Sequence, residues 1–178
     1  MKKLFVFVGD GGSGKTTLIA ELTKRYPRQF QKLVTCTSRL PRKDEVTGTD
    51  YHFHVENYFI DNPELVLVKR TDKGDYYGTR LPDPTPKNLH SLLTLRFAGI
   101  QRLVALGLGN VTVINISITE DLKIARMRQR GDSEHMIRDR LEIDASDRAG
   151  VDWGQFPIVH LNAADTIDAN VASIINVS

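Results

Sequence analysis

The chain has 178 residues, of which 40% are hydrophobic and 26% are charged. A chain of this composition can bury a core, which excludes a disordered polymer, and its length predicts one domain with room for small inserted lobes. Its 24 Lys and Arg residues nearly balance 22 Asp and Glu residues, so the net charge of +2 by itself indicates no binding to nucleic acid or to an anionic membrane.

The single cysteine, Cys36, excludes an internal disulfide and a cysteine-rich zinc site, and it suits a reducing compartment. No apolar run approaches the roughly 20 residues that a membrane helix needs. The apolar run at the start is too short for a signal peptide and leads into glycines rather than a cleavage site. We therefore expect a cytoplasmic protein, a monomer or homodimer, without a membrane or nucleic-acid partner.

Strands and helices are predicted to alternate along most of the chain. A continuous apolar run at residues 4–8 is typical of a strand buried on both faces, and apolar residues at helical spacing follow from 16 to 26. Further strands are predicted at 91–95, 111–116 and 157–161, and further helices at 97–106, 120–129, 133–148 and 167–175. This alternation predicts an α/β fold with three layers around a parallel sheet.

The pattern changes between residues 33 and 80, where polar residues and turns increase and residues 47–50 suggest a tight turn. We expect a small inserted lobe there and a core built from residues 1–32 and 81–178. Residues 81–87 contain three prolines and predict a stiff connector, because proline lacks a backbone donor and restrains its neighbours.

Residues 9–16 read Gly-Asp-Gly-Gly-Ser-Gly-Lys-Thr and match the pattern G-x-x-x-x-G-K-[ST], between a predicted strand and a predicted helix. We call this segment the phosphate loop, since glycines let successive N–H groups wrap a phosphate at the positive end of a helix. The residues expected to hold a nucleoside triphosphate are Gly9, Gly11, Gly12, Ser13, Gly14, Lys15, Thr16 and Thr17. Lys15 would reach the β- and γ-phosphates, and Thr16 would ligate Mg²⁺. The alternative is a glycine-rich turn with an exposed lysine.

Two stretches of the inserted lobe have a distinctive spacing of arginines, tyrosines and glycines. Residues 37–53 read T-S-R-L-P-R-K-D-E-V-T-G-T-D-Y-H-F, and residues 74–79 read G-D-Y-Y-G-T. They resemble the guanylate kinase family, whose members carry T-x-R-x-P-R-x-x-E-x-x-G-x-D-Y-x-F and G-N-Y-Y-G-[ST], with Asp75 in place of the asparagine. The two arginines of the first stretch suit a phosphate, because a guanidinium binds two oxygens at once. The resemblance implies a three-layer P-loop kinase core with a parallel sheet, an inserted acceptor-binding lobe and a helical lid at about residues 126–140.

The resemblance also implies an enzyme that uses ATP and Mg²⁺ to phosphorylate a nucleoside monophosphate, converting GMP or dGMP to GDP or dGDP. By matching positions, the implied acceptor-binding residues are Thr35, Arg39, Arg42, Tyr51, Tyr77 and Thr79. Lys15, Arg39, Arg130 and Arg140 are implied to act in catalysis, and Arg126 and Asn162 to contact ATP. The alternative for the lid arginines is a solvated, salt-bridged helix, because residues 120–148 contain seven Lys and Arg and eight Asp and Glu.

Three further positions depart from the family. Counting back from Tyr77, Val68 stands where the family has a glutamate that binds guanine. Residues 94–96 stand where the family has a D-x-D pattern, so Thr94 and Arg96 replace its two carboxylates. The alternatives are therefore a P-loop kinase for another nucleotide or a sugar phosphate, or a non-catalytic binding module of the guanylate kinase type.

Overall fold

The structure is a computed structural model that describes residues 2–42, 45–60, 62, 65–71, 74–80 and 89–178. The chain divides into two compact units: unit 1 comprises Met1–Gln31 and Leu89–Ser178, and unit 2 comprises Lys32–Asn88. The predicted connector at residues 81–87 lies outside the described residues. Among the residues that are described, no helix is long and apolar enough to cross a membrane.

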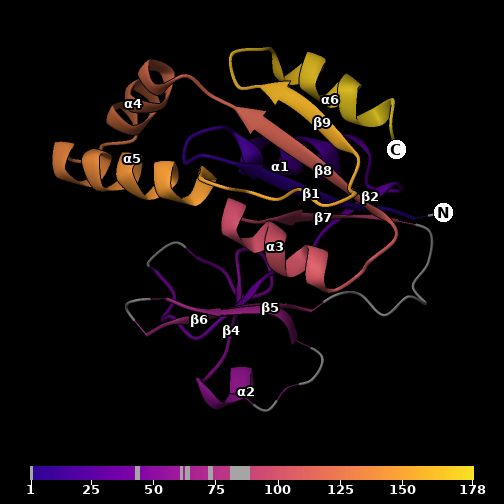
Figure 1. The fold of residues 1–178 in the computed structure, drawn as a ribbon, viewed down its shortest axis with the longest axis vertical. Coiled ribbons are helices and arrows are strands. Elements are labelled where there is room, and N and C mark those ends of the chain that lie inside the picture. The colour runs from indigo at the N-terminus through magenta and orange to yellow at the C-terminus, as the bar shows by residue number, and fades with distance from the viewer. Residues whose placement is uncertain (1, 43–44, 61, 63–64, 72–73, 81–88) are drawn as a thin grey trace. The chain divides into compact units, whose positions relative to one another are not determined.

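A five-stranded sheet forms the centre of unit 1 (Figure 1). Its strands are β1 (Leu4–Gly9), β2 (Phe30–Lys32), β7 (His90–Thr94), β8 (Val111–Ser117) and β9 (Ile158–Asn162). They follow the order β2-β7-β1-β8-β9, and β7, β1, β8 and β9 pair in parallel. The predicted parallel sheet is thus confirmed. The sequence analysis did not predict β2, which is too short to show a hydrophobic period.

The helices of unit 1 are α1 (Lys15–Arg25), α3 (Phe97–Ala105), α4 (Glu120–Gln129), α5 (Glu134–Arg148) and α6 (Ile167–Ile175). Each confirms a predicted helix to within about one residue at either end. Thr119, Ser133 and Thr166 precede α4, α5 and α6, and each side chain accepts a backbone N–H from the first turn. These caps satisfy donors that have no partner within the helix.

The apolar core of unit 1 lies between the sheet and helices α1 and α6. Phe5 of the central strand is buried in one cluster with Leu22 of α1 and Ile174 of α6. Figure 1 shows α3 on the other side of the sheet from α6. Helices therefore cover both faces of the sheet, which is the three-layer α/β fold expected from the sequence.

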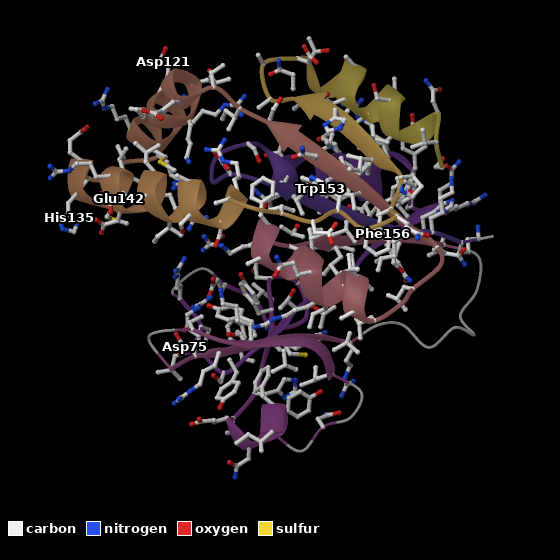
Figure 2. All side chains as sticks on the ribbon, in the orientation of Figure 1. Asp75, Asp121, His135, Glu142, Trp153 and Phe156 are labelled. Carbon is white, nitrogen blue, oxygen red and sulfur yellow. The ribbon has the colours of Figure 1, made fainter. Side chains whose placement is uncertain are left out.

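Helices α4 and α5 follow β8 and contact one another (Figure 1). Figure 2 shows Asp121, His135 and Glu142 on their outer surface, where all three are exposed. The buried side chains of the two helices are Lys123, Met127, Ile137 and Asp144. Two of these four side chains are charged, which is unusual for an inward-facing position.

Unit 2 contains a four-stranded sheet in the order β4-β3-β6-β5 and one short helix. Its elements are β3 (Cys36–Thr37), β4 (His52–Phe53), α2 (Asn57–Ile60), β5 (Leu65–Arg70) and β6 (Tyr76–Arg80). The pairing of β5 with β6 shifts between Val66 and Lys69, and Leu67 has a positive φ of 57°. This irregularity is a β-bulge, which rotates the following side chains relative to the partner strand.

Replacement of Leu22 by Ala is expected to lower the free energy of unfolding of unit 1 by about 2–5 kcal/mol, because the removed atoms leave a cavity in the core. Leu22 is 0% exposed. Urea denaturation followed by the fluorescence of Trp153 measures the change. Met136→Ala is the control, since Met136 is 59% exposed, and its effect should stay within about 0.5 kcal/mol. Equal effects of the two substitutions would contradict this packing.

Candidate functional site

The phosphate loop connects β1 to α1 in unit 1. Gly14 stands at the N-cap of α1 with a φ of 94°, in the left-handed region that glycine adopts without strain. Ser13 is buried, whereas Thr16 and Thr17 in the first turn of α1 are exposed. Their hydroxyls and the amino end of the helix therefore remain accessible to an anion and its counter-ion.

Lys15 folds back over the phosphate loop. Its ammonium lies 2.7 Å from the carbonyl oxygens of Gly9 and Asp10 and 3.2 Å from Ser13 Oγ. These acceptors keep the charge beside the glycine backbone, where a phosphate group can take their place as the hydrogen-bond partner.

Arg126 of α4 connects the phosphate loop to the segment after β9. One end of its guanidinium donates to the carbonyl oxygen of Gly12 and the other to that of Ala163, both at 2.8 Å. Asn162, the last residue of β9, uses its side-chain oxygen to accept the N–H of Ala164 at 2.9 Å. The predicted ATP-contacting residues Arg126 and Asn162 thus come together beside the loop, with the Asn162 side chain shaping a turn.

The other two predicted lid arginines differ in their surroundings. Arg140 lies against the loop, since a Cβ added to Gly11 would lie 2.8 Å from Arg140 Nε. The absence of a side chain at position 11 is what gives the guanidinium room. Arg130 instead pairs with Asp132, and 62% of its side chain is exposed. The structure therefore brings Arg126 and Arg140 to the phosphate loop and leaves Arg130 in solvent.

In unit 2, Arg39 is the centre of a cluster with two tyrosines. Its Nε donates to the hydroxyl of Tyr77 at 3.3 Å, and its guanidinium lies over the ring of Tyr51, 5.4 Å from the centroid. The two tyrosine rings are 5.9 Å apart. Arg39, Tyr51 and Tyr77, which are far apart in the sequence, thus form one polar and aromatic group.

Glu45 joins this cluster to the predicted residue Arg42. One carboxylate oxygen lies 2.8 Å from the Arg39 guanidinium, and the other accepts the backbone N–H of Arg42, also at 2.8 Å. The hydrogen bond from Arg39 holds the pKa of Glu45 below its usual range. The side chain of Arg42 is exposed. Glu45 belongs to the matched motif, but only this contact gives it a role.

The remaining predicted acceptor residues lie on or next to the same sheet. Thr79 is buried on β6 opposite Val66, and Thr35 is half-buried one residue before β3. Val68 packs against the small apolar cluster of unit 2, with its Cγ2 3.3 Å from where a Cβ would stand on Gly78. Val68 therefore contributes to packing, in a strand, β5, that carries no carboxylate.

The sequence analysis missed the roles of three buried charged groups, of which Asp10 lies in the phosphate loop and Lys123 and Asp144 lie beside it. Lys123 Nζ lies 3.2 Å from Asp10 Oδ2 and 2.7 Å from Asp144 Oδ2. Asp144 Oδ2 also accepts the backbone N–H of Gly11 at 2.9 Å. A signal was present for the lysine: it precedes the buried Met127 by four residues, which places it on the inward face of the helix.

Arg96 stands at the position of a family carboxylate, and carboxylates of α5 neutralise its charge. It forms an ion pair with Asp147, and its guanidinium lies 3.8 Å from Asp144 Oδ1. The described part of the chain contains no group of three or more His, Cys, Asp or Glu residues arranged to hold a metal ion.

Known proteins resemble this chain in sequence and in fold. The sequence profile of the guanylate kinase family, described as "Guanylate kinase", matches residues 1–176. A guanylate kinase of Chlamydia abortus is 29% identical over 165 residues, which cover 89% of this chain and 80% of the relative. A guanylate kinase of Lactobacillus acidophilus is 30% identical over 173 residues, covering 93% of this chain and 84% of the relative.

The fold agrees with this result. The crystal structure of a guanylate kinase from Anaplasma phagocytophilum superposes with a TM-score of 0.68 at 19% identity, covering 99% of this chain and 84% of that one. At 19% identity, this structural similarity shows the fold alone. Because the family profile spans nearly the whole chain, the protein is a member of the guanylate kinase family of nucleoside monophosphate kinases.

Proposed function

We propose that this chain transfers the γ-phosphoryl group of ATP to GMP or dGMP, producing ADP and GDP or dGDP. The observation that carries the proposal is the presence of two separate groups suited to phosphate. Unit 1 provides the phosphate loop with Lys15, and unit 2 provides Arg39 with Tyr51 and Tyr77. Two such groups match a reaction that transfers a phosphoryl group from a triphosphate to a monophosphate.

The transfer needs no side-chain nucleophile. An oxygen of the acceptor phosphate forms a bond to the γ-phosphorus while the bond from that phosphorus to the β–γ bridging oxygen breaks and ADP leaves. Lys15 and Arg140 are proposed to neutralise the charge that spreads over the transferring group, because both lie against the phosphate loop. Arg126 would hold the donor beside Asn162. Arg130 would contribute only after releasing Asp132.

Mg²⁺ is proposed to accompany ATP. The exposed Thr16 hydroxyl in the first turn of α1 is a suitable ligand, and Mg²⁺ usually keeps several waters and uses few protein ligands beside the phosphates. When bound, the ion would reduce the negative charge of the phosphates, with the Thr16 hydroxyl as its protein ligand. Lys15 and the loop amides would then orient the same phosphates.

Residues 33–80 are proposed as the acceptor lobe, with residues 1–32 and 81–178 as the core and residues 126–140 as the lid. Arg39, Arg42 and the two tyrosines would hold the GMP phosphate, and Thr35 and Thr79 would contact the base. Since β5 carries no carboxylate, hydroxyl groups would have a larger part in recognising guanine than the family pattern implies.

The reaction is tested by ADP release in a coupled assay with a panel of ribo- and deoxynucleoside monophosphates and sugar phosphates. GMP and dGMP should give the highest kcat/KM. Lys15→Ala is expected to lower kcat by at least about 10²-fold, because it removes a preorganised charge from the transferring phosphate. Lys24→Ala is the control, since Lys24 is exposed at the end of the same helix.

Turnover confined to a sugar phosphate or to another nucleotide would assign the chain a different acceptor. Absence of turnover together with unmeasurable ATP affinity would instead indicate a binding module.

Replacement of Arg42 by Ala is expected to raise the KM for GMP by about 10- to 100-fold while the KM for ATP stays unchanged, because a hydrogen bond to a charged group is lost. Initial rates at varied GMP and saturating ATP measure the effect. Arg70→Ala is the control in the same unit, since its side chain is 61% exposed. A larger change in the KM for ATP than for GMP would contradict the assignment of unit 2.

The protonation state of Lys15 links ATP binding to pH. Burial lowers the pKa of Lys15 from 10.5 to about 8, and the nearby charge of Arg140 acts in the same direction, while Asp144 and Asp10 oppose it. A bound triphosphate stabilises the charged ammonium and must raise this pKa again. Above pH 8, binding of ATP therefore requires uptake of a proton.

ATP affinity is expected to be nearly constant between pH 7 and the pKa of about 8, and then to fall by up to about tenfold per pH unit. Calorimetric titration with ATP in two buffers of different ionisation enthalpy measures the proton uptake. Lys24→Ala should show the same uptake as the unmodified chain, and Lys15→Ala should show none. Equal uptake by both variants would rule out Lys15 as its source.

A further inference from the structure

A buried lysine on α4 forms ion pairs with two carboxylates beside the phosphate loop. Lys123 is 1% exposed, and its partners Asp10 and Asp144 are 5% and 4% exposed. Asp10 belongs to the loop and Asp144 to α5, so the lysine of α4 bridges the other two elements. Burying three charged groups is costly, and replacement by apolar side chains is often neutral or stabilising. A contribution to stability alone is therefore a weak explanation for them.

Three consecutive residues of the phosphate loop are each held by a side chain from α4 or α5. The carboxylate of Asp10 contacts Lys123, and Arg148 lies 3.2 Å from the same Oδ2 atom. The N–H of Gly11 donates to Asp144. The carbonyl oxygen of Gly12 accepts from Arg126, as described above. The side chain of Asp10 and the backbone of Gly11 and Gly12 are thereby held by contacts outside the loop.

Asp144 also contacts a predicted catalytic group. Its Oδ1 lies 3.4 Å from Nε of Arg140, one turn earlier on α5, while its Oδ2 accepts the Gly11 N–H at 2.9 Å. One carboxylate therefore binds both the loop backbone and the guanidinium that lies against it. Because both contacts involve the same rigid group, the position of Arg140 relative to the loop depends on Asp144.

The contacts of the cluster favour the ionised form of Asp144. Burial works against ionisation of Asp144, but hydrogen bonds from Lys123 and from the Gly11 amide outweigh it and leave the pKa of Asp144 below its usual range. The other oxygen of Asp10, Oδ1, has no hydrogen-bond partner among the residues that the structure describes. Asp10 therefore depends on Lys123 and Arg148 for compensation of its charge.

We propose that Lys123 and Asp144 are positioning residues for phosphoryl transfer, which fix the Asp10–Gly11 segment of the phosphate loop and the guanidinium of Arg140. Asp144 acts through Arg140 and the Gly11 amide. Lys123 acts by neutralising two carboxylates that would otherwise repel the triphosphate. This inference rests on the proposed function, and it adds two residues to the reaction that the family motifs do not contain.

Asp144 is tested by a double-mutant cycle with Arg140. Asp144→Asn keeps the shape of the side chain and removes its charge. It is expected to lower kcat with ATP and GMP by about tenfold, with the KM for GMP unchanged within about twofold, since the acceptor contacts lie elsewhere. In the Arg140→Ala background the same substitution should lower kcat by less than about twofold, because the group through which it acts is gone.

The role of Lys123 is tested by removing its positive charge and then removing one of the two negative charges that it neutralises. Lys123→Met is expected to weaken ATP binding and lower kcat/KM for ATP by at least about tenfold, because Asp10 and Asp144 then face each other without the cation between them. Adding Asp144→Asn removes one of the two carboxylates. The double variant should therefore exceed Lys123→Met in kcat/KM for ATP by at least about threefold.

Two control variants come from an exposed ion pair at the same two helices. Arg128→Met and Glu134→Gln remove the partners of a pair whose side chains are 60% and 65% exposed, and both should leave kcat unchanged. Thermal unfolding of every variant identifies those that are folded at the assay temperature. If Lys123→Met fails to fold, the double-mutant cycle with Arg140 still tests the role of Asp144. The role of Lys123 is then tested by the ATP affinity of the folded double variant Lys123→Met/Asp144→Asn.

Equal loss of kcat on Asp144→Asn in both backgrounds would overturn the positioning role, as would a double variant no better than Lys123→Met. Failure of the proposed function has a different signature, since the unmodified chain would then release no ADP with GMP. If the chain does not phosphorylate GMP, the role of Lys123 is tested by ATP affinity, measured with ATP and Mg²⁺ alone. Weakening by Lys123→Met and recovery in the double variant would support the proposal, and equal affinities would refute it.

Discussion

The shape of the phosphate loop depends on hydrogen bonds and ion pairs that reach it from two helices. A glycine-rich backbone is free to adopt many conformations, so its affinity for a polyphosphate depends on what restricts it. Here Arg126, Lys123 and Asp144 bind three consecutive loop residues. The geometry of the phosphate loop and the positions of α4 and α5 are therefore coupled. A displacement of either helix would change the loop that we propose binds ATP.

In unit 2, a contact within the protein likewise orients a group suited to phosphate, but that contact also competes with the phosphate. Arg39 is already paired with Glu45, so the acceptor phosphate that we propose Arg39 binds would share or displace that carboxylate. The pairing orients the guanidinium in advance, which reduces the entropy lost on binding, but it also weakens the net attraction for an anion. Glu45 thus links the affinity of the acceptor cluster to the order of the segment between Arg39 and Arg42.

Much of unit 1 was predictable from the sequence because its elements are long and regular. The strand at Leu4–Gly9 is a continuous apolar run, the helix at Ile167–Ile175 has a clear hydrophobic period, and the loop between β1 and α1 has a distinctive glycine pattern. The strands of unit 2 were not predictable in the same way. Strand β3 has two residues, and the bulge near Leu67 shifts the pairing of β5 by an amount that no period reveals.

The site was predictable where residues belong to motifs and unpredictable where they act through tertiary contacts. Lys15 and Arg39 follow from their patterns. Asp144 does not, because charged residues in a helix usually face water, and for Lys123 the four-residue spacing from Met127 is the sole signal. The different surroundings of Arg130 and Arg140, both expected in the lid, likewise depend on which neighbour each guanidinium meets.

The absence of a side chain at Gly11 has a consequence of its own. The Arg140 guanidinium occupies the space that a Cβ would fill, while the Lys15 contacts are made by other atoms of the loop. A single methyl group at this position would push the guanidinium outward and leave the lysine in place. Alanine at position 11 would then displace Arg140, which we propose acts in phosphoryl transfer, while Lys15, which we propose binds the triphosphate, keeps its contacts.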